Sequence, residues 1–143
     1  VFKSDEYTIY TRLITGNYFP YQKMFTEGEI NTCASRTALI GAMTRAKMCT
    51  EEKQPAVFQI EDDVLNISIR DKLADYQEQV PLQETVCKSI RLGFDSRLVL
   101  ETLKAFTCDN IALGFTSPRT PMIVEAEDSD MKAMVLPVAI REA

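Results

Sequence analysis

The chain contains no histidine, which removes the commonest general base, the usual partner of a Ser or Cys nucleophile and the commonest metal ligand. Glycine is scarce as well: there are five in 143 residues, and they form no phosphate-binding loop, dinucleotide fingerprint or nucleophile elbow. Chemistry based on carboxylates or lysine stays open, but most acidic residues lie in turn-like runs such as 61–63 and 127–130. An enzyme is therefore the least favoured class of protein.

The cysteines are far apart in the sequence and include no Cys-x-x-Cys pair. Zinc sites and thiol redox motifs use close pairs, so we expect no metal, no cofactor, and buried free thiols in a reducing compartment. No apolar run approaches the roughly 18 to 20 residues that cross a bilayer, and the first residues lack the apolar core of a signal peptide. These features predict a cytoplasmic protein. The absence of an initial Met suggests a piece of a longer chain.

A change of hydrophobic period marks a helix in the first half of the chain. Residues 30–34 alternate as in a strand, and Ser35 is placed to cap a helix. From residue 36 to 49, apolar side chains recur at the i, i+3, i+4 and i+7 spacing of an amphipathic helix. Three strand-like runs then follow, at 57–60, 64–70 and 76–80, with a tight turn expected at 61–63.

The same order recurs in the second half. After a strand at 89–94, either Asp95 or Ser96 is placed to cap a helix. That helix and the three strands after it are predicted at 97–106, 110–115, 122–125 and 134–140, with turns at 117–119 and 127–130. Since Ser35 and Asp95 are 60 positions apart, we expect an α+β domain of two similar β-α-βββ halves packed about a pseudo-two-fold axis. Ahead of both halves, residues 1–4 and 7–14 read as a hairpin.

The two predicted helices are basic although the chain is acidic. They carry five cations against one carboxylate, a net charge of +4, whereas the whole chain carries −5, which leaves −9 outside the helices. Solvated helix faces could account for such an excess. The alternative is a surface that faces a polyanion on one side of the protein and repels it elsewhere.

The chain resembles the C-terminal part of the bacterial DNA sliding clamps, the beta subunits of DNA polymerase III. The similarity rests on the order and spacing of several local motifs. These are Leu39-x-x-Ala42-Met43-x-Arg45-Ala46, Leu92-Gly93-Phe94-Asp95 followed by Leu98-Val99-Leu100-Glu101, Ser117-Pro118-x-x-Pro121-Met122-Ile123, Met134-Val135-Leu136-Pro137-Val138, and Leu13-Ile14-x-Gly16-Asn17-Tyr18 ahead of Pro20-Tyr21.

The resemblance implies a DNA-clamp-like domain with its two helices on one side and antiparallel sheets on the other. Residues 1–22 would be the terminal hairpin and linker of the preceding clamp domain, and residues 23–143 the C-terminal domain. The implied function is a non-catalytic processivity factor: a ring of two such proteins encircles duplex DNA and slides on it without reading its sequence. The resemblance implies that five basic residues face the DNA: Arg36, Arg45, Lys47, Arg97 and Lys104.

Clamps of this family bind short linear peptides of polymerases, clamp loaders and repair proteins in an apolar pocket. The resemblance places here the pocket residues Lys23, Met24, Asp95, Leu98, Arg119, Pro121, Met134, Leu136, Pro137 and Val138. It places Phe19 and Pro20 at the entrance, and we expect Val135 to serve the core. The alternative to a clamp is a free-standing α+β regulatory module that binds a peptide or a small ligand and no DNA.

Overall fold

The computed structural model describes the 143 residues except 50–53, 71–74, 128 and 141–143. In chain order the described elements are β1 (Phe2–Lys3), β2 (Thr8–Ile9), the 3-10 helix η1 (Tyr21–Met24), β3 (Ile30–Ser35), α1 (Arg36–Met48), β4 (Ala56–Arg70), β5 (Asp75–Phe94), α2 (Ser96–Ala105), β6 (Asn110–Phe115), β7 (Met122–Ala126) and β8 (Ser129–Val135).

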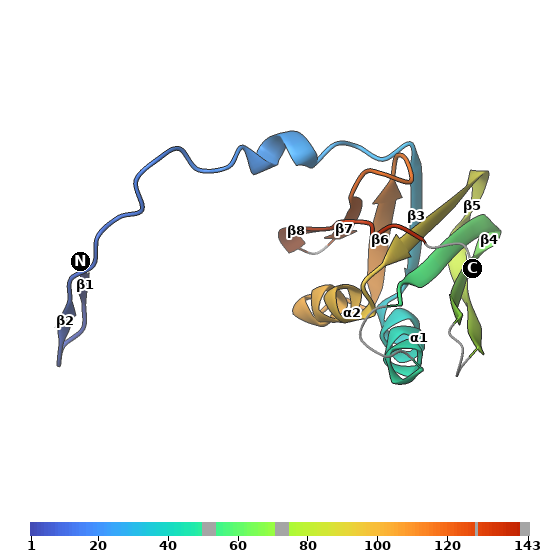
Figure 1. Ribbon diagram of the computed structural model, residues 1–143, viewed down its shortest axis with the longest axis horizontal. Coiled ribbons are helices and arrows are strands. Elements are labelled where there is room, and N and C mark those ends of the chain that lie inside the picture. The colour runs from blue at the N-terminus through green and yellow to red at the C-terminus, as the bar shows by residue number, and fades with distance from the viewer. Residues whose placement is uncertain (50–53, 71–74, 128, 141–143) are drawn as a thin grey trace.

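Strands β3 to β8 form an antiparallel sheet in the order β4-β5-β3-β6-β7-β8. Helices α1 and α2 pack together and lie on the same side of the strands (Figure 1). The order strand, helix, strands occurs twice, first in β3, α1, β4 and β5, and again from the end of β5 through α2 to β8. The prediction of an α+β domain with antiparallel strands and both helices on one side is confirmed.

Both helices begin at the caps that the sequence predicts. The Ser35 side chain accepts a hydrogen bond from the Ala38 amide at 3.4 Å, and the Asp95 carboxylate accepts one from the Arg97 amide at 2.9 Å. The predicted apolar face of α1 is buried at Leu39, Ala42, Met43 and Ala46, while α2 buries Val99, Leu100 and Leu103. These side chains join one core with the aromatic pair Phe58 and Phe94, whose ring centroids lie 5.2 Å apart.

The strands between the helices are longer than predicted. The turn expected at 61–63 is wrong, because β4 runs through it without reversing. Its register against β5 slips on either side of Asp62, whose φ of 52° lies in the left-handed region. Three acidic residues suit an exposed bulge as well as a turn, since either leaves them in water. The runs predicted at 76–80 and 89–94 are likewise parts of the single strand β5.

The end of the chain also differs from prediction. Strand β8 begins inside the turn expected at 127–130 and ends at Val135, so the strand predicted at 134–140 is wrong beyond that residue. Pro137 has no amide to donate, which removes a ladder hydrogen bond from the segment that follows. That segment is held instead by an isolated antiparallel bridge, in which the Val138 amide donates to the Gly93 carbonyl at 2.8 Å.

Residues 1–20 form an exposed arm that leads away from the sheet (Figure 1). The predicted hairpin is present but short, since β1 and β2 pair over Phe2↔Ile9 and Lys3↔Thr8. The strand predicted to continue to Ile14 is wrong beyond Ile9. The division of the chain near residue 22 into parts of two clamp domains stays a prediction.

Candidate functional site

The last strands and the start of α2 bring most of the predicted pocket residues to one edge of the domain. The register Met122↔Val135 sets Pro121 beside Leu136, and Met134 pairs with Ile123. The bridge from Val138 to Gly93 carries the C-terminal segment past the strand that leads into Asp95 and α2. Sequence-distant parts of the predicted pocket therefore meet in space.

This edge exposes apolar side chains that a core would bury. Leu98 is 52% exposed, Leu136 58% and Val138 41%, while Val135, which directly precedes Leu136, is 3% exposed and belongs to the core, as expected. Met134 and Pro137 are half-buried. We call these three exposed residues, Leu98 in the first turn of α2 and Leu136 and Val138 in the segment that bridges Gly93, the apolar edge. Exposed apolar side chains of this kind are typical of a surface that binds another molecule when they form a patch.

A hollow of about 410 Å³ lies next to the apolar edge. Of the predicted pocket residues, Arg119, Pro137 and Val138 line it. The prediction missed its remaining walls, which are Arg91, Leu92, Gly93, Pro118, Ala139 and Ile140. The alternation of β5 could have indicated that Arg91 and Gly93 share a face, but only the bridge to Val138 shows that the C-terminal segment crosses there.

Lys23 and Met24 lie in η1, within the segment that leads into β3. The hydrogen bonds of η1 join residues 19–25 to one another, and Tyr21 makes edge-to-face contacts with the rings of Tyr18 and Phe25. Neither Lys23 nor Met24 lines the hollow beside the apolar edge. Phe19, predicted at the pocket entrance, is 62% exposed. A pocket role for this segment stays a prediction.

Asp95, at the edge of the site, caps the N-terminus of α2. Its carboxylate accepts from the Arg97 amide and lies 3.4 Å from the Arg97 guanidinium. Burial alone would raise the pKa of the Asp95 carboxyl, but the hydrogen bonds from Arg97 and the Leu98 amide and the Arg97 charge together lower it. The carboxylate is therefore held ionised at the first turn of α2, where it complements the helix dipole.

The five predicted DNA-facing residues lie on the helices, but their charges are not equally available. Arg36 is half-buried at the start of α1, and its Nε donates to the Cys108 carbonyl at 2.6 Å. Arg97 pairs with Asp95. Lys47 and Lys104 are exposed.

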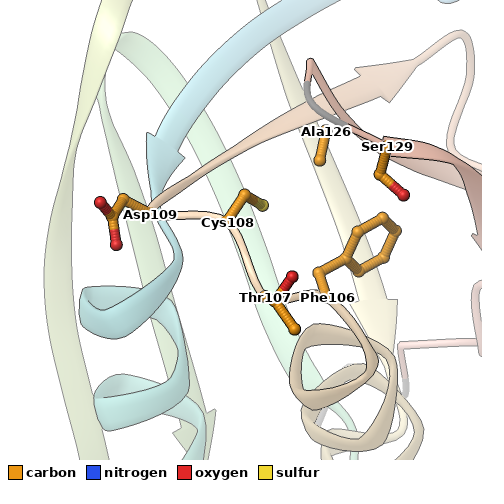
Figure 2. Close-up of a pocket in the computed structure, with 6 residues that line it drawn as sticks. All are labelled: Phe106, Thr107, Cys108, Asp109, Ala126 and Ser129. Carbon is orange, nitrogen blue, oxygen red and sulfur yellow. The ribbon is translucent and has the colours of Figure 1, made fainter.

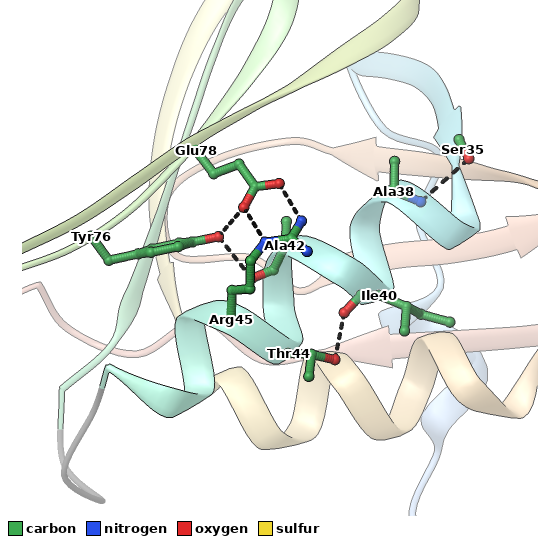
Figure 3. A network of polar contacts seen from close by, with 8 residues as sticks. All are labelled: Ser35, Ala38, Ile40, Ala42, Thr44, Arg45, Tyr76 and Glu78. Carbon is green, nitrogen blue, oxygen red and sulfur yellow. Dashed lines mark hydrogen bonds and ion pairs between the residues drawn. The ribbon is translucent and has the colours of Figure 1, made fainter.

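Arg45 belongs to a network that joins α1 to β5 (Figure 3). Its Nε and Nη2 donate to the two oxygens of Glu78 at 2.8 and 2.5 Å, and the Tyr76 hydroxyl is within hydrogen-bonding distance of Glu78 and of the Ala42 carbonyl. The bonds from Arg45 and then Tyr76 lower the pKa of Glu78 to about 2. Burial, together with the Glu78 bond, raises the pKa of Tyr76 to about 12. Glu78 therefore offsets the charge that Arg45 would present to a polyanion.

Further features of the domain are a hollow past the end of α2 and four free cysteines. A hollow of about 310 Å³ past the end of α2 is lined by Phe106, Thr107, Cys108, Asp109, Ala126 and Ser129 (Figure 2). All four cysteines are free; Cys87 is exposed, contrary to the expectation of buried thiols, and the others are half-buried. Burial, with the charges of Glu84 and Glu127, raises the pKa of Cys33. In the described part of the chain, no cluster of metal-ligating residues is found and no helix is long and apolar enough to span a membrane.

Comparison with known proteins extends the likeness over the whole domain. The "Beta sliding clamp" of Streptococcus pneumoniae serotype 4 is 23% identical over 146 residues, covering 99% of this chain and 38% of that protein. That of Staphylococcus aureus strain Mu50 is 24% identical over 143 residues, covering 96% of this chain and again 38% of the protein. The chain thus spans about 38% of the length of these curated relatives.

Solved structures agree on the fold. A putative DNA polymerase III beta subunit from Eubacterium rectale superposes with a TM-score of 0.82 at 22% identity, over 90% of this chain and 35% of that one. The DNA polymerase sliding clamp of Pseudomonas aeruginosa gives a TM-score of 0.83 at 19% identity, over 91% of this chain and 36% of that one.

One family model covers most of the chain. Residues 24–139, which run from the end of η1 to the C-terminal segment, match the model described as "DNA polymerase III beta subunit, C-terminal domain". Membership agrees with the expectation of a non-catalytic protein, and it gives the alternative of a free-standing regulatory module no support. The chain belongs to the family formed by the C-terminal domain of the DNA polymerase III beta subunit.

Proposed function

We propose that this chain is part of a processivity factor of bacterial DNA replication, a homodimeric ring that encircles duplex DNA in the cytoplasm and slides on it. The observation that carries the proposal is the family match over residues 24–139. The basic helices lie on one side of the domain and the apolar edge is exposed at the end of the sheet. This placement supports the use of separate surfaces for DNA and for protein partners.

In this proposal the helix side faces DNA. Long cationic side chains that meet phosphates bind without reading base sequence, which suits a sliding contact. Lys47 and Lys104 are used as probes of this side because both side chains are exposed, one on each helix. A ring uses such contacts for retention, and retention should therefore depend on salt.

The DNA-facing assignment is tested in the complete gene product that contains this chain. We expect the double substitution of Lys47 and Lys104 by Glu to speed loss of the protein from circular DNA, most strongly at low salt. The matched control reverses Lys88 and Lys132, which are exposed on β5 and β8, by the same charge. Equal retention of the helix variant and the wild type at low salt would contradict the assignment.

The apolar edge is proposed to take the apolar side chains of short peptides from polymerase, clamp loader and repair partners. Met134 and Leu136 lie close together at the edge of the sheet, and a flexible Met beside a Leu can repack around different peptides. Lys23, Asp95 and Arg119 would supply polar groups around the apolar walls.

The peptide assignment is tested with a labelled peptide that carries a Gln, a Leu and a terminal Leu-Phe pair. In the complete gene product, we expect Met134→Asp with Leu136→Asp to abolish binding and to leave the circular dichroism spectrum unchanged. Met131→Asp is the matched control, because Met131 is also on β8 but is not one of the pocket residues. Undiminished affinity in the Met134 and Leu136 variant would exclude this pocket.

A further inference from the structure

The hollow beside the apolar edge combines two guanidinium groups with apolar walls. Arg91 comes from β5 and Arg119 from the turn before β7, while Pro118, Pro137, Val138 and Ile140 supply apolar surface. The described residues that line it include no carboxylate, although the chain has 21 acidic residues against 16 basic ones. We call it the arginine hollow.

Local structure holds both arginines in place. Arg91 shares a strand face with Gly93, which bridges Val138, so Arg91 lies alongside the C-terminal segment. The turn that carries Arg119 is closed by several hydrogen bonds. The Thr120 amide donates to the Ser117 carbonyl at 3.2 Å, the Ser117 amide donates to the Thr120 hydroxyl at 2.9 Å, and the Arg119 amide donates to the Ser117 hydroxyl at 3.3 Å. A fixed backbone lowers the entropy lost when the side chain binds.

We propose that the arginine hollow takes a carboxylate of the partner peptide whose apolar side chains cover the apolar edge. The inference rests on the proposed function and adds a preference of this chain for acidic peptides. A guanidinium binds a carboxylate through paired N–H donors, so Arg91 and Arg119 match this group better than they match an amide or a hydroxyl. The carboxylate can come from an Asp or Glu side chain or from the free C-terminus of the peptide.

A second hollow on the outer face of β4 and β5 shares Arg91 but has a different character. It is larger, about 660 Å³, and Glu61 and Asp75 lie among its walls together with Arg70. These carboxylates would repel an acidic peptide, whereas the described residues that line the arginine hollow supply two guanidinium groups and apolar side chains and no carboxylate. Arg70 therefore provides a matched control: it borders the second hollow with Arg91 but does not line the arginine hollow.

The test measures peptide affinity by fluorescence anisotropy in the complete gene product. The reference is the amidated peptide with a Gln, a Leu and a terminal Leu-Phe pair, and two further amidated peptides add Asp or Asn after the Phe. A fourth is the reference peptide with a free C-terminal carboxylate. We expect the Asp peptide to bind about two to five times more tightly than the Asn peptide, the range produced by an exposed ion pair. This ratio should fall toward one at high salt.

The variants decide whether the arginine hollow is responsible. We expect Arg91→Gln to bring the Asp-to-Asn ratio close to one, Arg91→Lys to keep part of it, and Arg70→Gln to leave it unchanged. A tighter free-acid peptide that loses its advantage in Arg91→Gln would identify the terminal carboxylate as a second source. A ratio of one in the wild type, or an unchanged ratio in Arg91→Gln, would overturn the inference while the peptide pocket stands. Failure of every peptide to bind would overturn both.

Discussion

Gly93 is the position where one added methyl group should loosen the proposed peptide site. A Cβ built on Gly93 would lie 2.8 Å from the Val138 carbonyl oxygen, 3.0 Å from the Ile140 Cγ1 and 3.3 Å from the Pro55 Cβ. The first of these atoms is backbone and cannot rotate away. Gly93→Ala therefore forces the C-terminal segment off β5 or strains both strands.

The loss in the free energy of unfolding depends on which response needs less free energy: displacement of the C-terminal segment, or strain with the segment kept in place. Overpacking a fixed site costs about 1 to 3 kcal/mol, whereas opening one backbone hydrogen bond costs about 0.5 to 1.5 kcal/mol. Because an isolated bridge holds Val138 to Gly93, we expect the segment to peel away, with a loss of about 1 kcal/mol in the free energy of unfolding. The local effect should be larger than the global one.

Hydrogen exchange of the Val138 amide measures the local effect, and urea unfolding measures the global one. The Val138 amide should lose its protection in Gly93→Ala, and affinity for the reference peptide should fall with it. Gly41→Ala in α1 is the control, because it adds the same methyl group away from the C-terminal segment. Its new Cβ would meet the Arg45 Nη2 at 3.2 Å, so the guanidinium bound to Glu78 must shift by a few tenths of an ångström, and this opposes the gain of about 0.5 kcal/mol in helix propensity; the Val138 amide should stay protected. A protected Val138 amide with unchanged peptide affinity in Gly93→Ala would refute the reasoning.

Substitutions at three further positions test the local structure. Because the pKa of Glu78 is lowered from 4.5 to about 2, its contribution to stability is complete above pH 4.5 and is lost as the pH falls toward 2. In Glu78→Gln, the urea midpoint should therefore change less with pH between 4.5 and 2 than it does in the wild type. An equal pH dependence of the midpoint in both proteins would contradict the role of the network. Asp95→Ala should cost about 1 kcal/mol by removing the cap of α2 and Asp95→Asn much less, so equal losses in thermal unfolding would exclude capping. Asp62→Val should cost about 1 to 2 kcal/mol at its positive φ, whereas Asp62→Gly should cost nothing; equal unfolding midpoints of the two variants would show that this backbone is not strained.

The parts of the fold that the sequence predicts well are set by neighbouring residues. Ser35 and Asp95 cap their helices through hydrogen bonds that reach two or three residues along the chain. The buried face of α1 follows from helical spacing alone, so its period could be read without knowing the rest of the fold.

The parts that it predicts poorly depend on pairing between distant residues. The acidic run at 61–63 has the composition of a turn, and only the partner strand β5 shows that β4 passes through it as a bulge. Arg45 and Glu78 are 33 positions apart, so the charge count of the helices could not show that this cation is offset. The basic excess of the helices was predicted, but not which residues present it to solvent.

The apolar edge shows why a binding surface of this kind escapes pattern analysis. Along a strand, alternate residues point to opposite faces, and a buried Val135 next to an exposed Leu136 fits ordinary sheet packing. Beyond Val135 the alternation no longer applies, because the strand ends and Pro137 cannot donate to a ladder. The exposure of Val138 is then fixed by its bridge to Gly93, 45 residues earlier in the chain, which also sets the wall of the arginine hollow. The same bridge shapes the apolar edge and the arginine hollow, so a change at Gly93 should alter the apolar and the acidic parts of peptide recognition together, whereas a change at Arg91 should alter the acidic part alone.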